Sequence, residues 1–190
     1  AYDARGGRTS TSYAELNAMA NRVAHVLLDE AGGPVRLSGA QLTRLPSIDG
    51  LIAVDELDRR VARRGPVHHS QPRIVTITQS TENGRVWPAP DIKGFVDHAH
   101  DLGLLVHVDG SRVANAIAAQ QVSPIDAVGD ADIVTVGGTK NGMAVGEAIL
   151  FFNRDLAIDF EYRCKQAGQL ASKMRYLSAP WVGILQDDAW

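Results

Sequence analysis

From Arg73 onward the chain alternates short apolar runs with longer segments of helical periodicity, and this alternation limits the folds it can adopt. Four runs are rich in β-branched or other apolar side chains: 74–78, 104–108, 133–136 and 148–152. Residues 91–102, 111–121 and 155–177 instead repeat apolar side chains at helical spacing. Strands that alternate with helices pair in parallel, and nearly continuous apolar strands are covered on both faces. The sequence therefore predicts an α/β fold with a mostly parallel sheet and helices on both faces.

The part of the chain before Arg73 has a less regular pattern. Residues 1–11 are polar and rich in glycine, and we expect them to be a mobile N-terminal segment. Residues 12–27 begin with a capping box and continue with apolar side chains at helical spacing, which predicts a helix. Residues 50–64 predict a second helix with one apolar face. Residues 35–49 do not favour one structure.

Composition argues against several classes of function. A formal net charge of -3 gives no field that would attract nucleic acid or an anionic membrane. No apolar run approaches the length of a membrane span. The pairs His68-His69 and His98-x-His100 do not fit a tetrahedral metal set, so we expect no metal. The single cysteine, Cys164, and the absence of an apolar leader at the first residues suggest a cytoplasmic protein.

Polar residues follow three of the predicted strands at the point where each strand ends. They are Gln79-Ser80-Thr81-Glu82, Asp109-Gly110-Ser111-Arg112 and Gly137-Gly138-Thr139-Lys140. Because sites in open α/β sheets lie beyond the carboxyl ends of the strands, these groups can converge on one edge. A carboxylate, a guanidinium and an amine would then meet there.

Each of these three charged residues has a functional and a structural interpretation. Lys140, set among glycines after a buried strand, can be partly desolvated and become nucleophilic, or can be an ordinary solvated loop lysine. A lysine that condenses with pyridoxal phosphate (PLP) needs a carboxylate to keep the ring nitrogen protonated, and Asp109 is placed for that. Asp109 can instead cap the next helix. Arg112 can bind an amino-acid carboxylate through two hydrogen bonds, or form a surface ion pair.

Several motifs together resemble the PLP-dependent L-threonine aldolases, in the β-eliminating lyase branch of the fold type I enzymes. The matching segments are His107–Arg112, Gly137–Gly142, Gln79–Gly84, Gly146–Ala148, Lys165–Leu170 and Ser172–Arg175. The likeness runs almost continuously from about Gly32 to Trp190, and the lysine loop is most similar to that of the low-specificity aldolases.

The resemblance implies a role for each site residue. Lys140 would bond covalently to the cofactor aldehyde, Asp109 would pair with the ring nitrogen, and Thr139 would contact the cofactor beside the lysine. Arg112 would contribute to the site for the substrate carboxylate. His25, in a segment that matches the family's stacking histidine, would lie against the cofactor ring and take part in catalysis.

The reaction implied by the resemblance is a retro-aldol cleavage of L-threonine or L-allo-threonine to glycine and acetaldehyde. The base that takes the β-hydroxyl proton is left open. Another branch of the family has a histidine where this chain has Glu82, so His25 and an ordered water are the candidates.

The chain departs from the family in ways that affect the expected domain layout. The turn that holds the cofactor phosphate in the family reads Leu16, Asn17 and Ala18 here, and Ala24 runs directly into His25. We expect residues 12–177 to form an incomplete PLP-binding large domain, and residues 178–190 to begin a connection to a C-terminal domain that this chain lacks.

The apolar surface left exposed by such missing parts predicts a homo-oligomer. Two alternatives to an active aldolase stay open. One is a catalytically impaired remnant of the same fold, and the other is a different fold type I lyase that acts on an amino acid.

Overall fold

The computed structural model describes residues 38–186, and the chain divides into two compact units. The larger unit comprises residues 44–157 and 173–190, and the smaller comprises residues 1–43 and 158–172. The larger unit contains the sheet and all three strand ends singled out above. The smaller unit contains one described helix, α6.

Two of the expected segments, the mobile segment over residues 1–11 and the helix over residues 12–27, lie outside the described residues. The division into a domain over residues 12–177 and a connection over 178–190 stays a prediction.

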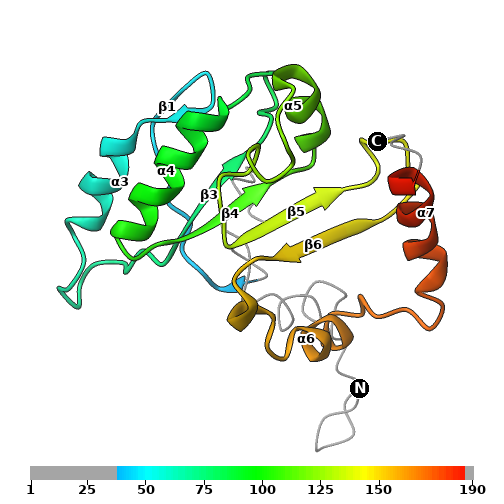
Figure 1. Ribbon diagram of the computed structural model, residues 1–190. Coiled ribbons are helices and arrows are strands. Elements are labelled where there is room, and N and C mark those ends of the chain that lie inside the picture. Colours follow the sequence, from blue (N-terminus) through cyan, green and yellow to red (C-terminus); the bar gives the residue numbers. More distant parts are fainter. Residues whose placement is uncertain (1–37, 187–190) are drawn as a thin grey trace, which may run out of the picture. The chain divides into compact units, whose positions relative to one another are not determined.

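A four-stranded sheet with the order β3-β4-β5-β6 forms the centre of the larger unit. Its strands are β3 (Ile74–Thr78), β4 (Leu105–Asp109), β5 (Ile133–Gly137) and β6 (Glu147–Phe151). β3, β4 and β5 pair in parallel, whereas β6 pairs antiparallel with β5, as the arrows in Figure 1 show. The α/β class and the mostly parallel sheet are therefore confirmed.

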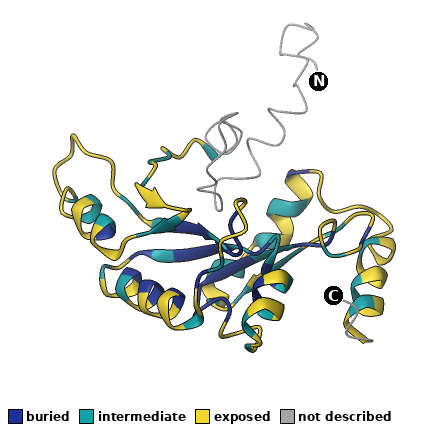
Figure 2. Ribbon diagram, turned by 90° about the horizontal axis from the view of Figure 1, so that it is seen from above, coloured by how far each residue is buried: buried dark blue, intermediate teal, exposed yellow. Residues whose placement is uncertain are grey.

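Helices cover one face of this sheet. The core joins Val75, Val106 and Val134 on the strands to α4 (Ala89–Asp101) and α5 (Val113–Gln120), which contribute Phe95 and Val113. In Figure 2 the strands are mostly dark blue and teal, whereas the helices show yellow outer sides. Alternation along each strand places these apolar residues on one face.

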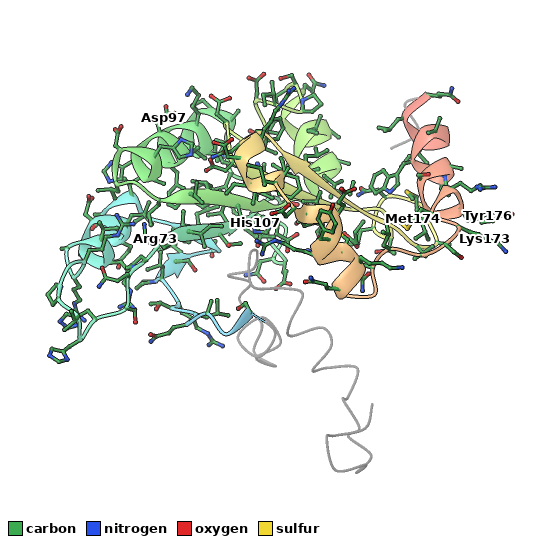
Figure 3. All side chains as sticks on the ribbon, turned by 90° about the horizontal axis from the view of Figure 1, so that it is seen from below. Arg73, Asp97, His107, Lys173, Met174 and Tyr176 are labelled. Carbon is green, nitrogen blue, oxygen red and sulfur yellow. The ribbon has the colours of Figure 1, made fainter. Side chains whose placement is uncertain are left out.

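The opposite face of the sheet carries polar side chains. His107, Asp109 and Thr135 alternate with the core residues, and His107 Nε2 lies 3.2 Å from Thr135 Oγ1 across the two strands. His107 is labelled on the sheet in Figure 3. The helices of the larger unit with described contacts to the sheet pack on the apolar face, so a helical layer on the polar face stays a prediction.

Asp132 fixes the start of β5 against the neighbouring strand. Its Oδ2 accepts hydrogen bonds from the Val106 N–H (2.8 Å) and lies 2.9 Å from His100 Nε2, while Oδ1 accepts one from Asn153 (3.1 Å). Burial acts to raise the pKa of Asp132, but these hydrogen bonds outweigh it and the pKa is lowered.

The helix expected over residues 50–64 is wrong in its first part. Ser47–Ile48 (β1) and Leu51–Ile52 (β2) form a small antiparallel hairpin, and the helix α3 spans only Val54–Val61. The turn residues Asp49 and Gly50 both have positive φ, 53° and 83°. An Asp-Gly pair is a strong signal for such a hairpin turn.

The single helix expected over residues 155–177 is also wrong. The chain forms a 3-10 turn η1 (Arg154–Ala157), the helix α6 (Phe160–Gln166) and, in the larger unit, α7 (Arg175–Gln186). Gly168, with φ of 69°, ends α6, and the Gln169 N–H donates to the Cys164 carbonyl at 2.8 Å. A glycine in the left-handed region is a common helix stop. Among residues 38–186, the helices are too short or too polar to cross a bilayer.

Candidate active site

The carboxyl ends of β4 and β5 and the amino end of β6 meet at one edge of the sheet. Asp109 pairs with Thr135, and Gly137, two residues further along β5, pairs with Glu147. Because side chains alternate along a strand, Asp109, Thr135 and Glu147 lie on the same, polar face. The loop that carries Lys140 begins at the same edge.

Asp109 does not cap α5, whose N-cap is Arg112, but one of its oxygens holds the turn before that helix. Its Oδ1 accepts hydrogen bonds from the Ser111 N–H at 3.0 Å and from Ser111 Oγ at 2.6 Å. These bonds hold residues 110–112 in a turn, so that α5 begins at Val113 rather than at Ser111 as expected. Asp109 Oδ2 receives no hydrogen bond from the described residues. That oxygen can accept one from an N–H group of a ligand.

Lys140 lies on a loop that is closed by hydrogen bonds between residues of the loop and its two ends. The Gly138 N–H donates to the Gly146 carbonyl at 2.8 Å, and Asn141 Nδ2 donates to the Gly137 carbonyl at 2.6 Å. Thr139 and Lys140 are exposed at the tip of this loop. The expected partial desolvation of Lys140 is therefore not found among the described residues. Its amine forms no ion pair with them and is free to react.

Glu147 is a residue of this site that the sequence analysis did not single out as functional. Burial raises the pKa of its carboxyl, the negative charge of Asp109 raises it further, and the positive charge of Lys140 opposes both. The charges of Asp109 and Lys140 thus act on Glu147 in opposite directions. The one sequence signal was a glutamate at the start of an otherwise apolar strand, within the Gly146-Glu147-Ala148 match.

Arg112 directly precedes α5 at the same edge of the sheet and is half-buried. It forms no ion pair with another described residue, so the surface ion pair considered from the sequence is not found within residues 38–186. Its guanidinium is available for an anionic ligand.

Gln79 and Glu82, which follow β3, differ in their burial. Gln79 is fully buried, and its amide makes three hydrogen bonds to the backbone, so it has a structural role. Glu82 is exposed. His25 and the segment Leu16–Ala18 lie outside the described residues.

The two spaced histidines on α4 contact aspartates. His98 Nε2 lies 3.0 Å from Asp58 Oδ1, and His100 lies beside Asp132. His98 and His100 therefore contribute to packing between α4 and the neighbouring segments.

Comparison with known proteins gives consistent matches. A family model described as β-eliminating lyase matches residues 10–190. A low-specificity L-threonine aldolase of Pseudomonas aeruginosa is 50% identical over 173 residues, which cover 90% of this chain and 50% of that protein. An alanine racemase, TOXG, of Cochliobolus carbonum is 30% identical over 128 residues, which cover 66% of this chain and 33% of that protein.

A solved structure of a Leishmania major threonine aldolase matches this fold with a TM-score of 0.80 and 22% identity, covering 93% of this chain and 55% of that one. At this identity the match concerns the fold alone. The chain spans about half the length of the curated relatives it matches.

Proposed function

Because this chain belongs to the β-eliminating lyase family, we propose that it is the cofactor-binding part of a PLP-dependent lyase. The proposed reaction is the cleavage of L-threonine and L-allo-threonine to glycine and acetaldehyde. The observation that supports the proposal is that Asp109 ends β4 and that the loop with Lys140 follows β5, the strand paired with β4. The identity of 50% to a low-specificity L-threonine aldolase supports this choice of substrate.

The residues present fit the two reactive ends of PLP. Asp109 Oδ2 receives no hydrogen bond from the described residues and can accept one from a protonated ring nitrogen. Lys140 is an exposed amine without an ion pair among the described residues and can bond to the aldehyde carbon. When bound, PLP supplies the electron-withdrawing ring that stabilises the negative charge left at the substrate Cα.

The protein's own groups then have distinct tasks. Asp109 keeps the ring nitrogen protonated, and its Ser111 hydrogen bonds fix the direction of the carboxylate. Arg112 binds the substrate carboxylate and orients the bond that breaks. Thr139 lies next to Lys140 and would contact the cofactor. We assign ring stacking to His25.

The remaining expectations follow from the same proposal. We propose that the protein acts as a cytoplasmic homo-oligomer. Exposed Val145, Leu150 and Phe152, at the hairpin of β5 and β6, together with Val182 and Leu185 on α7, provide apolar surface for such association.

A racemase is the second candidate function. The observation that favours it is the match to alanine racemase over 66% of this chain. A racemase removes a proton from Cα, whereas an aldolase cleaves the Cα–Cβ bond. Both reactions need an acid at the ring nitrogen and a lysine at the cofactor. A catalytically impaired chain of the same fold is the third outcome that the assays distinguish.

The test is a titration of the purified chain with PLP, followed by visible absorbance. We expect an absorbance band from lysine-bound cofactor that Lys140→Ala abolishes and that Asp109→Asn weakens. Lys93→Ala, which removes an exposed lysine on α4, is the matched control and should retain the band. A chain without the band at saturating PLP would contradict the proposal.

Substrate assays then separate the candidate functions. L-threonine, L-allo-threonine, phenylserine and L-alanine are each incubated with the loaded chain, and both glycine and D-alanine are measured. Release of glycine supports the aldolase, whereas racemised L-alanine without glycine supports the racemase. A cofactor band without turnover of any of these amino acids would indicate the impaired chain.

A further inference from the structure

Asn141, the residue after Lys140, closes the lysine loop through two of its N–H groups. Its side-chain Nδ2 donates to the Gly137 carbonyl at 2.6 Å, and its backbone N–H donates to the Gly138 carbonyl at 2.9 Å. The second bond joins residues i and i+3, as in a β-turn, with Thr139 and Lys140 between them. One residue therefore holds the last carbonyl of β5 and closes the turn that carries the lysine.

The Gly137 carbonyl lies beyond the part of β5 that pairs with β4. That pairing reaches Thr135, whose carbonyl accepts a hydrogen bond from the Gly110 N–H at 2.7 Å. The chain then turns into α5, so the described pairing with β4 stops two residues before Gly137. Gly137 is buried, and a buried carbonyl without a donor is costly. Asn141 supplies this donor in place of the neighbouring strand.

The surroundings of Asn141 would suit an apolar side chain better than an amide. Asn141 is half-buried at a cavity whose other lining residues are apolar or aromatic, among them Val136 on β5, Ala148 on β6 and Trp181 on α7. An amide costs free energy in such a place unless it forms a hydrogen bond. Packing alone therefore does not account for an asparagine here, whereas its bond to the Gly137 carbonyl does.

Building on the proposed function, we propose that Asn141 is a positioning residue for Lys140. It does not touch the reacting atoms but fixes the backbone from which the lysine side chain extends. The lysine side chain is exposed at the tip of the loop, so the position of its amine depends on how firmly the loop is held. A displacement of about 1 Å can lower the rate of a positioned reaction about a hundredfold.

The first experiment uses the cofactor-free chain and measures the mobility of the loop. Asn141→Leu keeps the size of the side chain and suits the apolar cavity but cannot donate to Gly137. The Met143 N–H donates to the Gly138 carbonyl at 3.0 Å, so its hydrogen exchange reports on the closed loop. Exchange at Met143 should become about two- to tenfold faster, the range that one lost hydrogen bond gives. Asn141→Gln, which keeps an amide N–H, should restore slow exchange in part.

Asn153→Leu is the matched control. Asn153 is also half-buried and lies past the other end of β6, where it donates to Asp132 Oδ1 at 3.1 Å. This variant removes a hydrogen bond of the same kind away from the lysine loop. Hydrogen exchange at Met143 should therefore stay as in the wild type, even where the free energy of unfolding falls.

The second experiment titrates each variant with PLP and then fixes the bound cofactor with borohydride. The apparent dissociation constant should be about two- to tenfold higher in Asn141→Leu and unchanged in Asn153→Leu. Mass spectrometry should show a smaller share of label on Lys140, relative to the exposed Lys93 on α4, in Asn141→Leu alone. A residue that only stabilised the fold would not change this share.

The outcomes separate this inference from the proposed function. Exchange at Met143 that is equal in Asn141→Leu and the wild type would overturn the positioning role and leave the cofactor proposal intact. Faster exchange with unchanged cofactor affinity would also overturn it, because the loop would then not govern the reaction of the amine. Absence of any cofactor band in the wild type would overturn the proposed function, and the positioning role with it.

Discussion

The buried amide of Gln79 allows a stability prediction to be worked out from single hydrogen bonds. Gln79 Nε2 donates to the carbonyls of Trp87 (3.0 Å) and Ala127 (3.1 Å), and Oε1 accepts from the Trp87 N–H (3.1 Å). All three residues are buried. Gln79 therefore connects the end of β3 to two segments that are distant in the sequence.

Replacing Gln79 with methionine preserves the side-chain length but removes these bonds. The Trp87 carbonyl keeps a second donor, Gln120 Nε2 at 3.2 Å. The Trp87 N–H and the Ala127 carbonyl lose the only side-chain partner described for each of them. A buried group left without a partner costs about 1–3 kcal/mol, so two such groups should lower the free energy of unfolding by about 2–6 kcal/mol.

Urea unfolding followed by tryptophan fluorescence measures this loss. Gln186→Met, at an exposed position on α7, is the matched control and should change the free energy of unfolding by less than about 0.5 kcal/mol. Equal stabilities of the two variants would refute the reasoning, because the buried backbone groups would then have found other partners.

Two further predictions concern other parts of the larger unit. The pKa of Asp132 is lowered because the hydrogen bonds it accepts outweigh burial. The stabilisation by the Asp132 carboxylate is therefore present at neutral pH and is lost as the pH falls through the lowered pKa. Asp132→Asn should lower the free energy of unfolding by about 1.5–3 kcal/mol at pH 7 and by progressively less below about pH 4. Urea unfolding at each pH measures this difference. A Cβ at Gly138 would lie 2.9 Å from the Gly146 carbonyl oxygen, so Gly138→Ala should lower the melting temperature and weaken the cofactor band. The control Gly94→Ala lies in α4 with open space around it and should raise the melting temperature, because alanine favours a helix more than glycine does. A normal cofactor band in Gly138→Ala would show that the loop tolerates the clash.

The elements that the sequence predicted well are those that local pattern determines. The runs at 74–78 and 133–136 form strands of nearly these bounds because their β-branched side chains suit a buried sheet. The hairpin at residues 47–52 was not predicted, because residues 35–49 favour no single structure and the apolar spacing after Gly50 also fits a helix. A single long helix after residue 155 was predicted wrongly, because the prediction did not treat Gly168 as the end of a helix.

The site was predictable only in part, for a related reason. Asp109 and Lys140 could be proposed as site residues because they lie at or after strand ends, and parallel strands bring their carboxyl ends together. Glu147 could not be found in this way, since its position depends on the antiparallel register between β5 and β6. The exposure of Lys140 depends on how its loop closes, which the composition of the loop does not determine.

The mixed sheet also affects the order in which the site can assemble during folding. Lys140 and Glu147 belong to one antiparallel hairpin, in which the paired residues are close in the sequence. Asp109 reaches β5 only through a parallel connection that contains α5. Because the entropy lost on closing a loop grows with its length, contacts within the hairpin are the easier ones to form. The hairpin that carries Lys140 and Glu147 can thus form early in folding, whereas Asp109 joins it only when the long-range pairing of β4 with β5 is complete.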